Sequence, residues 1–470
     1  MPAFLALWLL SSLVLLSCTP YRAGGREKTR VDLPKTYAGS EALQKTMQPP
    51  PRWWYSFGDP NLNRVMQSAI RDNLDLRSAW ARLQQSRAVL SQATSARWPQ
   101  LDAQLQGSRQ KITTLFGSFQ NSLYTASLAA SYELDVFGRI SASVKAAGLE
   151  ALAAREDIEA LAISLSAEVV EAWFDCVEAQ ARSELLEEQL RMNRTYLDLV
   201  TLRFQEGLVS AVDVHQQQQI VASIEGQLAL ATADTATRGN RLRLLLGDAR
   251  AQVTPAQKQL PNLPAVPAVG VPSQLLRDRP DIRAARARVE AADHRIASAV
   301  AERFPALRLT GTLGVSSTSL RDLLESLIWS VIGNATAPLI DGGRRKAAVA
   351  QQRALLEERL ADYLRVIVQA MLEVENALVL ERQNQAALEA LQREIASVDK
   401  SVEETRARYQ EGLSDYLPVL SALQQKQQLE VRILSTQRQR LSYRVQLHRA
   451  LGGSWTAALT PPRGKGKRGS

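Results

Sequence analysis

The sequence has few of the residues that most often carry chemistry. Its 470 residues include only 2 cysteines, 3 histidines and 5 methionines. The histidines, His215, His294 and His448, lie far apart, and no HxxxH or CxxC spacing occurs, which argues against a metal site. No phosphate-binding run of the GxxxxGK type precedes a serine or threonine. We therefore expect neither an enzyme nor a bound cofactor, and any energy must come from a partner.

A strong excess of one charge is also lacking. The chain has 57 Lys and Arg against 48 Asp and Glu, which gives a net charge of +9. Such a balance can indicate nucleic acid or an anionic membrane surface. The charges are dispersed except in the tail from Arg463 to Arg468, which we interpret as a solvated terminus. Nucleic acid is therefore not the expected partner.

The N-terminal apolar run is too short for an ordinary membrane-spanning helix. It extends from Ala3 to Leu16, has no Lys or Arg before it, and is followed by Ser17 and Cys18. It resembles a lipoprotein signal peptide with Cys18 as the lipid-attachment residue, and Thr19 favours the outer membrane by the rule of that class. A plain secretory signal with a coincidental cysteine is the alternative. Cys176 cannot bridge to a lipidated Cys18, so no disulfide framework is expected.

Two nearly identical six-residue segments lie 205 residues apart, Arg203–Leu208 and Arg408–Leu413. Each interrupts a long helical pattern with a glycine that follows polar residues and precedes an apolar one. One helix ends and another begins in this way. We interpret the segments as tips of helical hairpins, at 206–211 and 411–416.

Four strands interrupt the helical pattern. Apolar and polar residues alternate at about 100–107 and 124–134, then at about 306–316 and, less cleanly, at 328–340. Each strand therefore has one apolar and one polar face. Three aromatic residues on these strands are candidates for a membrane interface: Tyr124, Tyr132 and Trp329.

The sequence predicts two tandem repeats, each with a helix, two strands, a very long helix, a tip and a return helix. One helix should extend from Pro60 to the break at Trp98, and another from about Ser141 to Glu206, roughly 100 Å long. The predicted segments are a signal peptide (1–17), a lipid-anchored tether (18–51), the first repeat (52–247), a Pro-rich linker (248–272), the second repeat (273–455) and a basic disordered tail (456–470).

Two arrangements suit four strands with one apolar face. The sheet could pack on a helix in a soluble domain. If the apolar face instead meets lipid, the sheet must close, and the smallest membrane barrels need about eight strands. Three copies would supply a barrel of about twelve strands around a polar lumen, which the long helices would extend as a tube.

Several segments resemble a known family. They are Trp53-Trp54 with Asp59-Pro60, the run from Pro272 to Arg283, Asp341-Gly-Gly343-Arg344 and the doubled tip. All are similar to the TolC-like outer-membrane factors of tripartite efflux pumps, of the NodT-type lipoprotein subfamily. The resemblance implies a mainly α fold with a small β part: a homotrimer with a 12-stranded outer-membrane β-barrel and a periplasmic α-helical coiled-coil barrel. It also implies a periplasmic adaptor and an inner-membrane transporter, proton-driven in our interpretation, as partners.

The resemblance also assigns a gate to the second tip. Tyr409 matches a family tyrosine that helps to close the periplasmic end; the alternative is a coiled-coil seam aromatic, which is compatible with gating. Asp213 and Asp415 follow the two tips and could each be a tip acid or a helix cap. Tyr409 and Asp415 are the predicted gate residues. Family members often have a further acid one turn along, where this chain has Pro418 and Ser421.

The exposed tips are the expected docking points for the adaptor: Gly207, Leu208, Gly412 and Leu413. Their alternative interpretation is turn chemistry alone, in which glycine supplies a left-handed backbone. We expect an outer-membrane exit duct that passively conducts small molecules. The alternatives are a type I protein-secretion duct and a non-conducting periplasmic coiled-coil scaffold.

Overall fold

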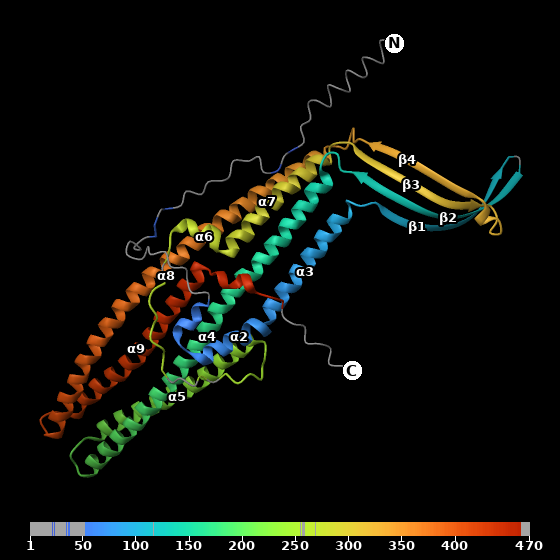
Figure 1. The fold of residues 1–470 in the computed structure, drawn as a ribbon. Helices are drawn as coiled ribbons and strands as arrows, with labels where there is room; N and C mark the ends of the chain where they lie inside the picture. Colours follow the sequence, from blue (N-terminus) through green and yellow to red (C-terminus); the bar gives the residue numbers. More distant parts are fainter. Residues whose placement is uncertain are drawn as a thin grey trace. The chain divides into compact units, whose positions relative to one another are not determined.

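The computed structural model describes residues 52–115, 117–253, 255, 259–267 and 269–461, together with residues 21, 23, 34, 36 and 37. The expected signal peptide, Cys18, most of the tether and residues 462–470 of the tail lie outside the described residues. Figure 1 shows the order of the elements along the chain.

The two halves of the chain have matching helices. The long helices α4 and α8 have 67 residues each, and the return helices α5 and α9 have 36 residues each. This equality confirms the repeat. In chain order the helices are η1 Trp53–Phe57, α2 Pro60–Asp72, α3 Leu74–Ser95, α4 Arg139–Gln205, α5 Ala211–Leu246, α6 Pro272–Asp278, α7 Pro280–Ala301, η2 Leu323–Glu325, α8 Arg344–Gln410, α9 Tyr416–Leu451 and η3 Ser454–Ala458.

The single helix expected from Pro60 to Trp98 is in fact two helices, α2 and α3. They meet at Asn73, whose Oδ1 accepts hydrogen bonds from the backbone N–H groups of Asp75 and Leu76 at 2.9 and 3.0 Å. The Asn73 amide also donates to the Leu245 carbonyl at 2.9 Å. The prediction was wrong here because the cap satisfies the first N–H groups of α3 while the amide joins the break to the end of α5.

The four strands form one antiparallel sheet in the order β1-β2-β3-β4. The first two strands are longer than expected. The first ends at residue 114 rather than at about 107, and the second begins at residue 117 rather than at about 124. The last strand ends at residue 336 rather than 340, so Leu339 and Ile340 lie outside it. The strands are β1 Gln100–Thr114, β2 Gly117–Leu134, β3 Ala306–Ser317 and β4 Leu327–Thr336.

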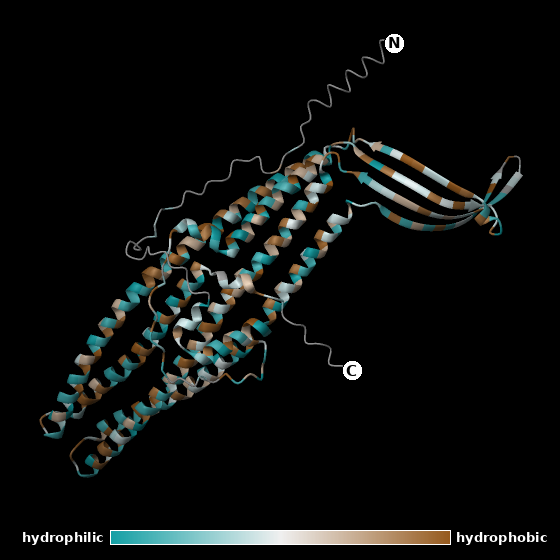
Figure 2. Ribbon diagram, in the orientation of Figure 1, coloured by the Kyte–Doolittle hydropathy of each residue, from teal (hydrophilic) through white to brown (hydrophobic). Residues whose placement is uncertain are grey.

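The strand register places apolar residues in rows across one face of the sheet. Leu128 pairs with Ala103 on β1 and with Leu313 on β3, and Leu313 pairs with Trp329 on β4. Residues paired in this way point to the same face. Trp329 is 73% exposed, so none of the described residues covers this part of the face. Figure 2 shows apolar positions recurring along the strands.

The chain divides into two compact units. Among the described residues, one contains the strands with residues 81–156 and 283–366, and the other contains residues 52–80, 157–282 and 367–461. Among the described residues, none of the helices combines the length and apolar composition needed to cross a bilayer.

In the unit that contains residues 52–80, 157–282 and 367–461, aromatic contacts join the entry segment at Trp53 and Trp54 to residues near the C-terminal end. Trp53 stacks on His448 with ring centroids 4.9 Å apart, and Trp54 meets Trp455 edge-on at 5.0 Å. Trp455 belongs to η3, where Thr456 is 1% exposed. The expected disordered tail from 456 is therefore wrong at its start, because η3 packs against the entry segment.

Buried arginines hold the connecting segments of the same unit. Arg279, from the run between Pro272 and Arg283, donates to Glu373 at 2.7 Å and to the Ala450 carbonyl at 3.0 Å. Arg444 is 1% exposed, pairs with Glu381 and donates to the carbonyl of Pro264 in the linker. Each guanidinium satisfies several acceptors at once, so both segments are fixed to the helices.

His448 gives this region a predicted pH dependence. Burial, together with the nearby Arg444 charge, lowers the pKa of His448 to about 3. The unfolded chain would take up this proton near the ordinary pKa of about 6.5, so stability is complete above that pH and falls as the pH decreases toward 3, by up to about 1.4 kcal/mol per unit.

We expect His448→Phe to weaken this pH dependence while keeping the stack on Trp53. Urea unfolding would measure the free energy of unfolding of both proteins at about pH 8 and about pH 5. Between these two pH values the wild type should lose roughly 2 kcal/mol more of this free energy than the variant. An identical pH dependence of the two proteins would contradict a neutral buried His448.

Candidate functional site: the hairpin tips

Both hairpin tips are built by the same backbone hydrogen bonds. Gly207 and Gly412 have φ of 71° and 73°, in the left-handed region. The N–H of Leu208 donates to the Arg203 carbonyl at 2.9 Å, and the N–H of Leu413 donates to the Arg408 carbonyl at 2.8 Å. These are the bonds of a Schellman turn, which ends a helix on a left-handed glycine. The repeated six residues therefore encode one turn twice.

The tips present apolar side chains to solvent. Leu208 and Leu413 occupy the same position in the two turns, and each is 67% exposed. Phe204 and Val212 flank the first tip at 44% and 60% exposure, and Leu417 follows the second at 54%. Gathered exposed apolar residues of this kind often mark a contact surface.

The two tip acids have different surroundings. Asp213 forms a capping box: its carboxylate accepts from the Ser210 N–H at 2.9 Å, and its own N–H donates to Ser210 Oγ at 3.4 Å. Asp415 is the N-cap of α9, yet its side chain accepts no capping hydrogen bond. Pro418 occupies the third helical position and has no N–H to donate. Asp415 is exposed, so its charge faces solvent.

Tyr409 packs between the two hairpins. It is 8% exposed, and its ring centroid lies 5.4 Å from that of Tyr416. The Arg203 guanidinium of the first hairpin lies 4.5 Å from the centroid of the Tyr409 ring, as in a cation–π contact. Among the described residues, the Tyr409 hydroxyl has no hydrogen-bond partner. The ring, rather than the hydroxyl, therefore makes the contacts within this chain.

Sequence reasoning missed the polar contact beside this ring. The Tyr416 hydroxyl donates to Gln217 Oε1 at 2.8 Å, and the Gln217 amide donates to the Asn193 carbonyl, also at 2.8 Å. All three side chains are at most 2% exposed. Burial raises the pKa of Tyr416, so its hydroxyl stays protonated and can donate. Asn193 on an otherwise apolar seam was the signal available in the sequence.

The polar chain continues along the hairpins. Asn193 donates to the Gln189 carbonyl at 2.7 Å, and the Gln189 amide donates to the Gln427 carbonyl at 3.2 Å and to Glu430 at 3.0 Å. These hydrogen bonds therefore join α4 and α5 of the first hairpin to α9 of the second. We call the set Gln189, Asn193, Gln217 and Tyr416 the polar ladder. An apolar cluster surrounds it: Leu186, Leu190, Val200, Val214, Ile220, Val221, Ile224, Ala231, Tyr409, Val419, Leu420 and Leu423.

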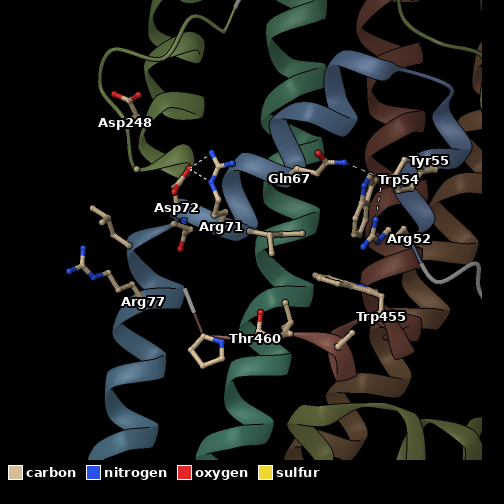
Figure 3. Close-up of a pocket in the computed structure, with 17 residues that line it drawn as sticks. Arg52, Trp54, Tyr55, Gln67, Arg71, Asp72, Arg77, Asp248, Trp455 and Thr460 are labelled. Atoms are coloured by element: carbon tan, nitrogen blue, oxygen red, sulfur yellow. Dashed lines mark hydrogen bonds and ion pairs between the residues drawn. The ribbon is translucent and has the colours of Figure 1, made fainter. Parts of the chain in front are cut away.

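The same unit also contains a cavity, but the side chains that line it do not form a catalytic arrangement. The cavity has a volume of about 1150 Å³. Figure 3 shows residues that line it, among them Arg52, Trp54, Tyr55, Gln67 and Trp455. Arg52 and Gln67 make long bonds to the Tyr55 hydroxyl, at 3.4 Å each, and Arg71 pairs with Asp72 at 2.7 Å. In the described part of the chain, no group of three or more His, Cys, Asp or Glu could hold a metal ion. The tips are therefore the stronger candidate site.

Comparison with known proteins identifies the family. Residues 65–248 and 271–453 match the family described as outer membrane efflux protein, with one match in each half of the chain. The chain belongs to this family.

Relatives and solved structures agree with this assignment. The outer membrane protein OprJ of Pseudomonas aeruginosa is 31% identical over 467 residues, covering 97% of this chain and 96% of OprJ. The toluene efflux pump outer membrane protein TtgF of Pseudomonas putida is 30% identical over 435 residues, covering 91% and 90%. The open-state structure of the MtrE outer membrane channel of Neisseria gonorrhoeae has a TM-score of 0.82, with 27% identity over 93% of this chain and 98% of that one.

The protein is accordingly an outer-membrane efflux channel of a Gram-negative-type cell, with its helical part in the periplasm. This confirms the predicted family, its mainly α fold with a small sheet, and the localisation. The family is one of transport channels rather than enzymes. The alternative of a non-conducting scaffold is not retained.

The tip geometry generates a prediction about glycine. Gly412→Ala forces a side chain into the left-handed region and should destabilise the turn by about 1–2 kcal/mol. Gly226 lies inside α5 with no atom within 4 Å of an added Cβ, so Gly226→Ala should stabilise that helix by about 0.5–1 kcal/mol. Hydrogen exchange at the tip and urea unfolding would measure both. Effects of the same sign at the two glycines would contradict the turn assignment.

Proposed function

We propose that three copies of this chain form an exit duct that passively conducts small molecules from the periplasm to the exterior. The observation that carries this proposal is the four-stranded sheet with an uncovered apolar face. Its outer strands, β1 and β4, each have one edge without a strand partner in the described chain. Backbone groups left unpaired in lipid cost several kcal/mol each, so copies must share a closed barrel. Three copies give about twelve strands, which exceeds the smallest closed membrane barrels.

The second tip is the proposed periplasmic gate. Tyr409 supplies a buried ring that contacts Arg203 of the first hairpin, and Tyr416 supplies a hydrogen bond to Gln217. Both contacts join the hairpins, so outward movement of the second hairpin would break them. Asp415, free of capping bonds, is the proposed acid beside the constriction. Asp213 is assigned to helix capping instead, because both bonds of its capping box are made.

The tips are the proposed docking points for a periplasmic adaptor, which would link the duct to a proton-driven inner-membrane transporter. Leu208 and Leu413 are exposed on rigid turns, and Gly207 and Gly412 fix their direction. Cys18 is the proposed lipid-attachment residue. A protein cargo delivered by an ATP-driven transporter remains the second candidate, and efflux assays with small molecules distinguish the two.

Removing the Tyr409 ring should open the gate. If the ring is buried only in the closed state, Tyr409→Ala would remove about 3 kcal/mol or more of packing energy from that state. The ratio of open to closed channels should then rise by about a hundredfold. Single-channel recording in planar bilayers would measure the closed-state conductance. Tyr409→Phe is the matched control, because it keeps the ring and removes a hydroxyl without a partner in the described chain. Unchanged conductance in Tyr409→Ala would remove Tyr409 from the gate.

Charged substitutions at the tips should prevent docking. Leu208→Asp with Leu413→Asp removes two apolar contacts worth about 1.5–3 kcal/mol each when buried, so adaptor affinity should fall at least about tenfold per site. Efflux in a strain that depends on this protein is the measurement. Leu230→Asp, at a position 74% exposed within α5, is the control, and heat-modifiable trimers should form in all variants. Normal efflux by the double variant would refute the docking assignment.

A further inference from the structure

The apolar rows of the sheet have a defined end. On β2 the alternating face extends from Tyr124 to Leu134, ten steps of about 3.3 Å, or roughly 33 Å along the strand. With a strand tilt of about 40°, this corresponds to about 25 Å along the membrane normal, the height of the apolar band in membrane barrels. Leu134 pairs with Leu307, and Leu307 with Ala335, in the last row. Whatever follows this row lies at the depth of lipid head groups.

Four strand-to-helix junctions follow this last row. The register brings the start of β1, the end of β2, the start of β3 and the end of β4 to one end of the sheet. We call these segments the junction belt: residues 97–99, 133–139, 302–308 and 338–346. They contain seven Lys or Arg and four Asp or Glu. The belt is thus basic where the apolar face stops.

Three of the four acids in the belt already have partners. Glu133 pairs with Arg139 at 2.8 Å and with Arg308 at 3.4 Å. Asp135 accepts from the N–H groups of Ile140 and Ser141 at the start of α4. Asp341 accepts from the N–H groups of Gly343 and Arg345 at the start of α8, and these bonds lower its pKa.

The belt has more basic side chains than carboxylates that could pair with them. Arg97, Arg303, Arg344 and Lys346 are exposed, and none makes an ion pair with a carboxylate in the described part of the chain. A hollow of about 420 Å³ lies in the same belt, but it is lined by Glu133, Asp135 and Glu302 as well as by Arg139, Arg308 and Arg345, which pair with carboxylates. The four exposed side chains without such pairs are therefore the ones free to bind an anion. These side chains offer donors suited to phosphate oxygens.

Large apolar side chains lie beside these charges. Trp98 is 71% exposed, Val136 61%, Leu339 93% and Ile340 96%. Leu339 and Ile340 directly precede the turn at Asp341, and the basic run Arg344 to Lys346 follows that turn. Exposed apolar residues adjacent to basic ones are typical of surfaces that lie in the membrane interface.

We propose that the junction belt binds the phosphate groups of anionic phospholipids in the inner leaflet of the outer membrane. Arg97, Arg303, Arg344 and Lys346 would contact the head groups, while Trp98, Leu339 and Ile340 lie among the upper acyl chains. The observations favour a lipid over a protein partner because the belt continues the lipid-facing rows without interruption. The proposal rests on the outer-membrane placement of the family and not on the proposed gate.

Lipid retention by the purified protein tests this surface. The protein in detergent would be mixed with phosphatidylglycerol or with zwitterionic phosphatidylcholine, and native mass spectrometry would count the retained lipids. Wild type should retain phosphatidylglycerol in preference. Each basic residue near a membrane surface is worth about a fivefold change, so Arg303→Gln, Arg344→Gln and Lys346→Gln together should lower this preference by about a hundredfold.

A matched triple variant is the control. Arg393→Gln, Lys400→Gln and Arg406→Gln change the same residue types at exposed positions of α8 in the other unit and should leave lipid retention unchanged. Leu339→Ser with Ile340→Ser should lower retention of both lipids while keeping the preference for phosphatidylglycerol. Single-channel conductance in phosphatidylcholine bilayers should be equal for all variants, which separates failure of this proposal from failure of the channel.

Two results would overturn the proposal. One is equal retention of phosphatidylglycerol by the junction triple variant and its control. The other is displacement of phosphatidylglycerol by inorganic phosphate at similar concentration, which would indicate a site for free phosphate rather than a lipid surface.

Discussion

Backbone hydrogen bonding at the two outer edges of the sheet is the constraint on which the rest of the structure depends. A single chain supplies four antiparallel strands, and its outermost strands cannot pair with each other within so small a sheet. In the proposed duct the apolar rows face lipid, which offers no partner for an exposed N–H group. Association of copies would then pair these edges within one closed barrel. The matching halves are consistent with this, since each contributes one hairpin and one pair of long helices.

The repeated halves share a backbone and differ in side chains. The turn bonds at Gly207 and Gly412 are equivalent, so the repeated six residues build the same turn in both halves. The first return helix has a complete capping box, whereas the second has a proline at the position where the cap would bind. A fully capped end is more stable than one that lacks these bonds. The return helix of the second tip thus has the less completely capped start of the two, which suits the gate proposed there.

Much of the fold could be predicted from local patterns. The tips and the return helix from Ala211 to Leu246 followed from helix periodicity and glycine, because these signals lie within a few residues. The extension of β1 to Thr114 could not, since residues beyond Gly107 do not alternate and their pairing with β2 alone makes them a strand. The break at Asn73 depends on Leu245, which is 172 residues away.

The candidate site shows the same limit. Tyr409 and the tip glycines could be singled out because each belongs to a repeated motif, and Asp415 because it directly follows the second tip. Tyr416 and Gln217 could not, because their contact exists only once two hairpins have adopted a fixed register. Arg203 was visible in the motif, but its position over an aromatic ring of the other hairpin was not. Pairings between distant helices depend on packing that no local pattern contains.

The polar ladder has a mechanical consequence for movement of the hairpins. Its four side chains are buried, and each donates or accepts at a fixed height along the helices. Sliding one hairpin lengthwise past the other, even by a single residue rise of about 1.5 Å, would strain the contacts that cross between them, Tyr416 to Gln217 and Gln189 to Gln427. A buried donor left unpaired costs about 1–3 kcal/mol. An outward swing of the second hairpin at its tip would act first on the Tyr416–Gln217 bond, because Gln189 and Gln427 lie farther from the tips. A lengthwise shift would act on both inter-hairpin contacts at once, so the contacts oppose a change of register more than an angular displacement of the tip.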